Sequence, residues 1–171
     1  FNFSENKTKL AFAFFEKDTA GAKAVQIEVF VYRMRMLWER KYALKISNPE
    51  YQIHDISVNN EGTETLLAIR SYTTGKKVQH TDSKAHLIWL TQYEQRQYEQ
   101  QIEKAWPTDI KCAFNLEGDY LMAGYYGKNA DKPKLAQGSF AYKYDQRRGY
   151  LKNSSTRDVK EYETDEMVKE G

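Results

Sequence analysis

The chain has 171 residues, of which 40% are hydrophobic and 29% are charged, and its formal net charge is +2. This composition predicts one folded domain with a hydrophobic core, and it excludes a collagenous or disordered chain. Basic and acidic residues are interspersed, so we expect no nucleic-acid binding. Apolar runs stay well below the ~18–20 residues that a membrane-spanning helix needs, so we expect no membrane span.

Three segments repeat one pattern, in which two short apolar stretches flank a polar, turn-forming stretch. They are residues 3–17, 56–72 and 112–128. Their second apolar runs begin at Leu10, Leu66 and Leu121, about 55 residues apart. Gly62 and Gly118 stand at the turns of two copies, and Asn6-Lys7 stands there in the first. The pattern predicts a β-hairpin in each copy, because Gly and Asn accept the backbone conformations of tight turns.

A second hairpin is expected after each of these segments, beyond a polar loop. Its turns are predicted at Tyr32-Arg33, Glu94-Gln95 and Asp145-Gln146, where apolar residues become scarce. Each unit then contains four antiparallel strands. We therefore predict an all-β fold of about three four-stranded propeller-type blades, because such repeated units bury both faces by stacking. The alternative is a β-sandwich built from the same hairpins.

The repeat region is expected to span residues 1–152, with units at about 1–50, 51–107 and 108–152. Residues 153–171 are polar and charged, and are expected to form a C-terminal tail. Residues 91–106 have a composition that favours helix, but their place in the repeat predicts a strand. Closed propellers typically have 4–8 blades. We therefore expect further blades of a longer protein, assembled copies or a partner to cover the edges, and favour the first.

The stretches KLAFAFF, VQIEVF, RMLWERKYAL, IHDISVNNEGTETLLA and FNLEGDYLMAGYYG resemble uncharacterised β-propeller repeat proteins of Bacteroidetes cell envelopes, with WD40-like, kelch-like or TolB-like blades. The resemblance covers roughly residues 1–150 and carries no catalytic motif. It implies a protein of the periplasm or the outer membrane. The Tyr32-Arg33 turn departs from the Asp-rich turn expected in that family.

Five residues are candidates for ligand binding. Asp55 and Asp109 begin corresponding strands, so they could line a central channel or, as the structural alternative, cap the loops between blades. Trp106, Tyr125 and Tyr126 could form an aromatic platform for a sugar or a peptide. Trp106 stands at a unit junction and is the tryptophan expected to be exposed.

Other reactive residue types are assigned structural roles. Cys112 shares one strand face with Ile110 and Phe114 and is expected to be buried, and Trp38 and Trp89 are expected to pack between blades. The histidines, among them His80 beside Asp82, do not show the spacing of a metal site. We predict no catalytic residue, metal or cofactor.

These observations and the resemblance together predict a non-catalytic scaffold for protein–protein interaction in the cell envelope, or an accessory subunit of an outer-membrane transport or secretion complex. Its partner would be another protein or further blades of the same chain. The alternative is a propeller that binds or hydrolyses glycans through acids on its channel face, with a glycan or peptide as ligand.

Overall fold

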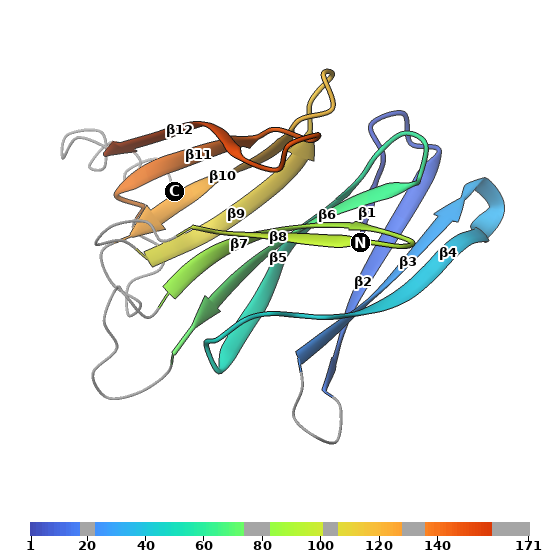
Figure 1. Ribbon diagram of the computed structural model, residues 1–171, viewed down its shortest axis with the longest axis horizontal. Coiled ribbons are helices and arrows are strands. Elements are labelled where there is room, and N and C mark those ends of the chain that lie inside the picture. The colour runs from blue at the N-terminus through green and yellow to red at the C-terminus, as the bar shows by residue number, and fades with distance from the viewer. Residues whose placement is uncertain (18–22, 74–82, 101–105, 128–135, 159–171) are drawn as a thin grey trace, which may run out of the picture.

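The computed structural model describes residues 1–17, 23–73, 83–100, 106–127 and 136–158. Within them, twelve strands form three four-stranded antiparallel sheets, and the strand order in each sheet follows the chain (Figure 1). Sheet 1 contains β1 (Asn2–Phe3), β2 (Lys9–Lys17), β3 (Lys23–Val31) and β4 (Arg35–Ala43). Sheet 2 contains β5 (Glu50–Val58), β6 (Glu64–Tyr72), β7 (Ser83–Thr91) and β8 (Gln95–Gln100). Sheet 3 contains β9 (Trp106–Phe114), β10 (Tyr120–Gly127), β11 (Gly138–Tyr144) and β12 (Leu151–Asp158). The predicted all-β fold with three four-stranded units is confirmed.

The first turn of each sheet explains the repeated sequence motif. Asn59 Oδ1 accepts hydrogen bonds from two backbone N–H groups of its turn, at 3.0 and 3.2 Å. Asn115 Oδ1 does the same in sheet 3, at 2.7 and 3.0 Å. Gly62 and Gly118 have φ of 77° and 84°, and Lys7 of sheet 1 has φ of 57°. Glycine is favoured at two of these turns because other residues adopt the left-handed conformation only at a cost in free energy.

The second hairpins turn where the sequence predicted. A short 3₁₀ segment, η1 (Tyr32–Met34), joins β3 to β4. The Thr91 N–H donates to the Glu94 carbonyl at 2.9 Å between β7 and β8. The Asp145 N–H donates to the Tyr150 carbonyl at 2.9 Å between β11 and β12. The predicted hairpins are therefore confirmed in all three units.

Sheet 2 lies between the other two sheets, with β5 against β9 on one side and against β1 and β2 on the other. Leu66 and Ala68 of β6 face sheet 3, while Leu67 and Ile69 face sheet 1. Because both faces are buried, β6 reads as a continuous apolar run rather than an alternating one. The first strands lie side by side, as in a propeller, so the arrangement is consistent with a partial propeller.

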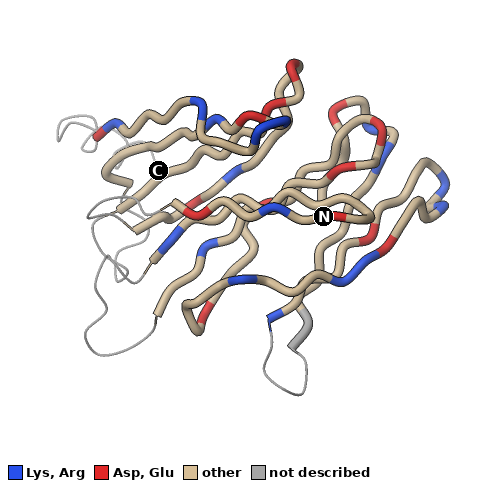
Figure 2. Tube along the Cα trace, in the orientation of Figure 1, with Lys and Arg blue, Asp and Glu red and all other residues tan. Residues whose placement is uncertain are grey.

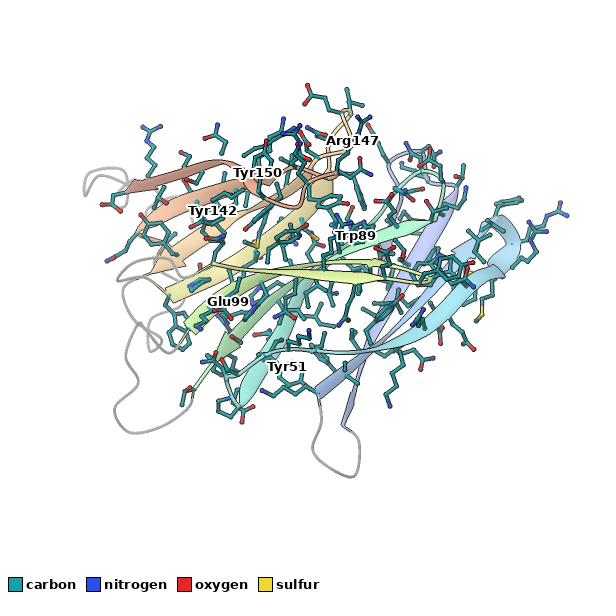
Figure 3. All side chains as sticks on the ribbon, in the orientation of Figure 1. Tyr51, Trp89, Glu99, Tyr142, Arg147 and Tyr150 are labelled. Carbon is teal, nitrogen blue, oxygen red and sulfur yellow. The ribbon has the colours of Figure 1, made fainter. Side chains whose placement is uncertain are left out.

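Side chains fill the space between the sheets (Figure 3). Trp38 and Trp89 are 6% and 8% exposed, which confirms their predicted packing roles. The Trp89 ring stacks on Tyr120 of sheet 3 with centroids 6.1 Å apart. Trp38 Nε1 donates to the Gly62 carbonyl at 2.7 Å, so this side chain also joins sheet 1 to the first turn of sheet 2.

Three details differ from the sequence analysis or go beyond it. The register places Ala11, and not Leu10, at the position of Leu66 and Leu121. The described part of 91–106 contains strand β8, as predicted, while 101–105 lie outside the described residues. Strand β12 continues to Asp158, beyond residue 152, and residues 159–171 are outside the described part.

Charged residues are distributed over all three sheets, with both signs interspersed (Figure 2). In the part of the chain that the structure describes, we find no helix both long and apolar enough to span a membrane.

Candidate functional site

The two predicted acids lie on the first strands of sheets 2 and 3, in different surroundings. Asp55 Oδ2 accepts a hydrogen bond from the Cys112 N–H at 3.1 Å, so this carboxylate joins sheet 2 to sheet 3. The side chain of Asp109 is 51% exposed, and its Oδ1 lies 3.9 Å from His54 Nδ1. The Asp55 carboxylate therefore has a structural role as a hydrogen-bond acceptor between two sheets, whereas the Asp109 carboxylate is accessible to solvent.

The histidine beside Asp109 belongs to a half-buried polar cluster between β5, β6 and β9. Burial, and to a smaller degree the nearby Arg70, lower the pKa of His54 to about 4, although Asp109 opposes both. His54 is therefore neutral at pH 7, and its contact with Asp109 is not an ion pair. Arg70 donates to the Pro107 carbonyl at 2.9 Å and to Gln52 Oε1 at 2.8 Å. The cluster therefore joins β5 and β6 of sheet 2 to β9 of sheet 3.

The three predicted aromatic residues do not form one platform. Trp106, which was expected to be exposed, is only 5% exposed, because it begins β9 and packs against Tyr72 with ring centroids 5.8 Å apart. Tyr126 is 6% exposed and lies in the core between sheets 2 and 3. Tyr125 is 53% exposed. Neighbouring residues of a strand point to opposite faces, which separates Tyr125 from Tyr126.

Ser71, which the sequence did not point to, and His86, one of the histidines considered for a metal site, meet between sheets 1 and 2. Ser71 Oγ lies 2.7 Å from His86 Nε2, and Glu99 Oε2 lies 3.7 Å from His86 Nδ1. A serine beside a histidine can act as a nucleophile when substrate reaches it. Here both residues are 0% exposed, and burial lowers the pKa of His86 to about 4. The pair is thus enclosed in the interior of the protein, and we assign it a structural role.

Cys112 is buried, as predicted, and burial raises the pKa of its thiol well above the ordinary value. Among the described residues, no group of three His, Cys, Asp or Glu side chains is placed to hold a metal ion. His80 and Asp82 lie outside the described residues.

Sheet 1 presents a large apolar surface on the side away from sheet 2, which we call the Phe face. Its members are Phe1, Phe3, Leu10, Phe12, Phe14, Phe30 and Met36. The Phe12 ring lies 5.6 Å from Phe1, 6.0 Å from Phe14 and 5.8 Å from Phe30, measured between centroids. Phe1, Phe14 and Met36 are 78%, 47% and 43% exposed. Contiguous exposed apolar surface of this kind is characteristic of interaction sites.

The corresponding faces of the other two sheets are covered within the chain. Leu67 and Ile69 of β6 are buried against sheet 1, and Tyr120 and Met122 of β10 are buried against sheet 2, all at 0% exposure. The Phe face was not predicted from the sequence. The feature that could have indicated it is the alternation of Ala and Phe at the start of β2, which makes both faces of that strand apolar.

Sheet 3 has the opposite free surface, which faces away from sheet 2 and which we call the Ala face. Its members are Ala113, Leu121, Ala123, Tyr125, Ser139, Ala141 and Ser155. Ala123 pairs with Ala141, which pairs with Ser155, so small side chains form a row across β10, β11 and β12, and Lys111 lies beside Ala123 on β9. The Ala face carries fewer large apolar side chains than the Phe face.

The chain was compared with known proteins. No family model matches the sequence, and no curated protein matches it either. Among solved structures, the chain is similar to a variant of the Synechocystis apocarotenoid oxygenase, with a TM-score of 0.58, 9% identity, and coverage of 86% of this chain and 35% of that one. A second variant gives a TM-score of 0.56 and 9% identity, covering 90% of this chain and 36% of that one. The chain thus spans about a third of the oxygenase.

A fucose lectin from Kordia zhangzhouensis, in complex with methyl-fucoside, gives a TM-score of 0.42 and 9% identity, with coverage of 87% of this chain and 93% of the lectin. At these identities the similarity to the oxygenase concerns the fold alone. The similarity to the lectin is too low to bear on function. The similarity to the oxygenase therefore supports an all-β fold.

Proposed function

We propose that this chain is a non-catalytic binding scaffold of propeller-type blades, and that its Phe face binds a protein partner. The observation that carries the proposal is the contrast between equivalent faces: those of sheets 2 and 3 are buried, whereas Phe14 on sheet 1 is 47% exposed. Aromatic side chains dominate the energetics of protein interfaces. Location in the cell envelope, and docking onto an outer-membrane transport or secretion complex, belong to the same proposal and rest on the family resemblance.

The surroundings of the reactive side chains support a non-catalytic role. Asp55 is hydrogen-bonded to the backbone of sheet 3, and Cys112 is buried with a raised pKa. Ser71 and His86 are enclosed at 0% exposure. Each of these groups has a structural partner, and a catalytic group has to reach its substrate.

The glycan alternative has less support. Two of the three predicted aromatic residues, Trp106 and Tyr126, are buried, which leaves Tyr125 as the exposed ring. Of the two predicted acids, Asp109 is the one with a largely exposed side chain. A sugar platform combines exposed rings with polar groups at one place, and these residues do not provide that combination.

The anionic dye 8-anilinonaphthalene-1-sulfonate tests whether the Phe face is an accessible binding surface, since its fluorescence increases on exposed hydrophobic surface. We expect the dilute wild-type chain to enhance its fluorescence and Phe14→Glu to remove most of the enhancement. Tyr93→Glu is the matched control, because Tyr93 is 77% exposed in the turn between β7 and β8. An enhancement that is absent, or is unchanged by Phe14→Glu, would overturn the proposal.

A further inference from the structure

We infer that the partner of the Phe face is the Ala face of a second copy of this chain, an inference that rests on the proposed function. Packing inside the chain provides the precedent. Sheet 1 covers sheet 2 with the face opposite its Phe face, and sheet 2 covers sheet 3 in the same way. One more repetition of this step places the exposed Ala face of one copy on the exposed Phe face of another.

Equivalent positions on the second strands show that the Ala face is a covering surface. Leu66 and Ala68 of β6 correspond to Leu121 and Ala123 of β10, by their places after the repeated turn. Leu66 and Ala68 are 0% exposed, because they lie against sheet 3. Leu121 is half-buried and Ala123 is exposed. At the two positions compared, the Ala face therefore has the same residue types as the surface of sheet 2 that covers sheet 3.

Side-chain size is complementary between the two free faces. In the core between sheets 2 and 3, the small Ala68 and Ala85 share one cluster with Tyr120 and Tyr142. These two alanines of the covering sheet, together with its larger Leu66, Leu87 and Trp89, meet aromatic rings on the covered sheet. The Ala face would present its row of small side chains to the phenylalanines, and such interdigitation is what close packing requires.

Charge is complementary as well. Glu28 of β3 and Glu39 of β4 are direct partners in the register, on the same face as the phenylalanines. Like charges directly opposite each other destabilise a sheet, so a basic partner surface would relieve them. The basic side chains on the Ala-face side of sheet 3 are Lys111 and Arg157, together with Lys143, which is already ion-paired with Glu117 and Asp119 at 2.9 and 3.0 Å. The Phe face also carries Lys41, and the Ala-face side also carries Asp109.

The two surfaces are different patches at opposite ends of the stack of sheets. Contact between them is therefore heterologous, and each added copy leaves one Phe face and one Ala face free unless a ring closes. This property distinguishes the head-to-tail contact from a symmetric pairing of two Phe faces, which would use one patch alone.

Sedimentation velocity and native mass spectrometry over a concentration series test the inference. We expect the wild-type chain, and the Tyr93→Glu control, to form species larger than the 20.1 kDa monomer as concentration rises. Phe14→Glu places a charged side chain on the Phe face. Ala141→Glu places an acid on the Ala face, where it would repel Glu28 and Glu39 on the Phe face of the docked copy. Each variant alone should stay monomeric, with a circular dichroism spectrum like that of the wild type. Their mixture should form a heterodimer, because each variant keeps the one face that the other lacks.

Two outcomes would overturn the inference. In one, the wild-type chain stays monomeric at every concentration while the dye still reports an accessible Phe face, which leaves the proposed function standing. In the other, Phe14→Glu blocks assembly and Ala141→Glu does not, which indicates symmetric pairing. A dye signal that does not depend on Phe14 would instead count against the proposed function itself.

Discussion

His86 shows how burial between sheets fixes the state of a single side chain. Its ring is 0% exposed and lies beside Ser71, with Glu99, Lys84 and Lys23 near enough to influence its charge. Burial outweighs the attraction of Glu99 and lowers the pKa of the ring to about 4. The sequence could not indicate this, because Ser71 and His86 come from neighbouring strands whose register is set by the whole sheet.

Folding stability should therefore depend on pH through His86. Its pKa is about 4 in the folded chain and about 6.5 in an unfolded one, so the unfolded state takes up the proton first as pH falls. Stability present above pH 6.5 is then lost progressively down to pH 4, by an amount on the order of 3 kcal/mol. His86→Gln should flatten this part of the profile, as measured by urea unfolding at a series of pH values. His54→Gln should flatten the same part of the profile, because burial lowers the pKa of His54 to about 4 as well. A His86→Gln profile parallel to the wild type would contradict the assignment.

Trp106 shows the limit of reasoning from position along the chain. Its place at the junction of two units predicted exposure, and Trp106 instead begins β9 and is 5% exposed. Arg70 lies 5.2 Å from the Tyr72 ring and 5.8 Å from the Trp106 ring, so three residues from two sheets enclose one another. Contacts between sheets determine that Trp106 is buried, and such contacts leave no periodic signal in the sequence.

Among the elements, β6 is the strand on which the stack most depends. Its residues alternate between the two cores, so it packs against sheet 1 and sheet 3 at once. β12 represents the other extreme, since all of its residues from Leu151 to Asp158 are exposed. We therefore expect the free energy of unfolding to be far more sensitive to β6 than to the outer strands and turns.

Leu67→Ala should lower the free energy of unfolding by about 2–5 kcal/mol, because it removes a fully buried side chain and leaves a cavity. Leu116→Ala is the matched control: it makes the same chemical change at a turn residue that is 97% exposed. Its effect should stay within about 0.5 kcal/mol. Urea unfolding followed by tryptophan fluorescence measures both. Equal effects of the two substitutions would contradict the burial of β6 between two sheets.

The sequence predicted the hairpins because turn residues and alternation are local signals. Gly62 and Gly118 indicated the first turns, and the fixed repeat showed that residues 95–100 form a strand despite their helical composition. The free faces were harder to predict. Phe12 and Phe14 look like core residues in the sequence, and only the order of stacking shows that their side of sheet 1 has no covering sheet among the described residues.

For the molecule as a whole, three sheets are stacked in chain order (Figure 1). This order leaves one large apolar face and one small-residue face at the two ends. Stacking one sheet on the next buries both faces of the middle sheet and one face of each end sheet. The same geometry that builds the core therefore also produces the two free end faces that are proposed to bind.

Hydroxyl-radical footprinting read by mass spectrometry tests most directly whether the Phe face is a free binding surface, since it labels exposed aromatic and sulfur-containing side chains. In dilute wild-type protein, Phe14 and Met36 should be labelled about as readily as the exposed Tyr93, while the buried Trp106 stays unlabelled. At higher concentration, Phe14 and Tyr125 should become protected together. If Phe14 and Met36 are as protected as Trp106 even at the lowest concentration, the Phe face is not a free surface and the proposed function is wrong.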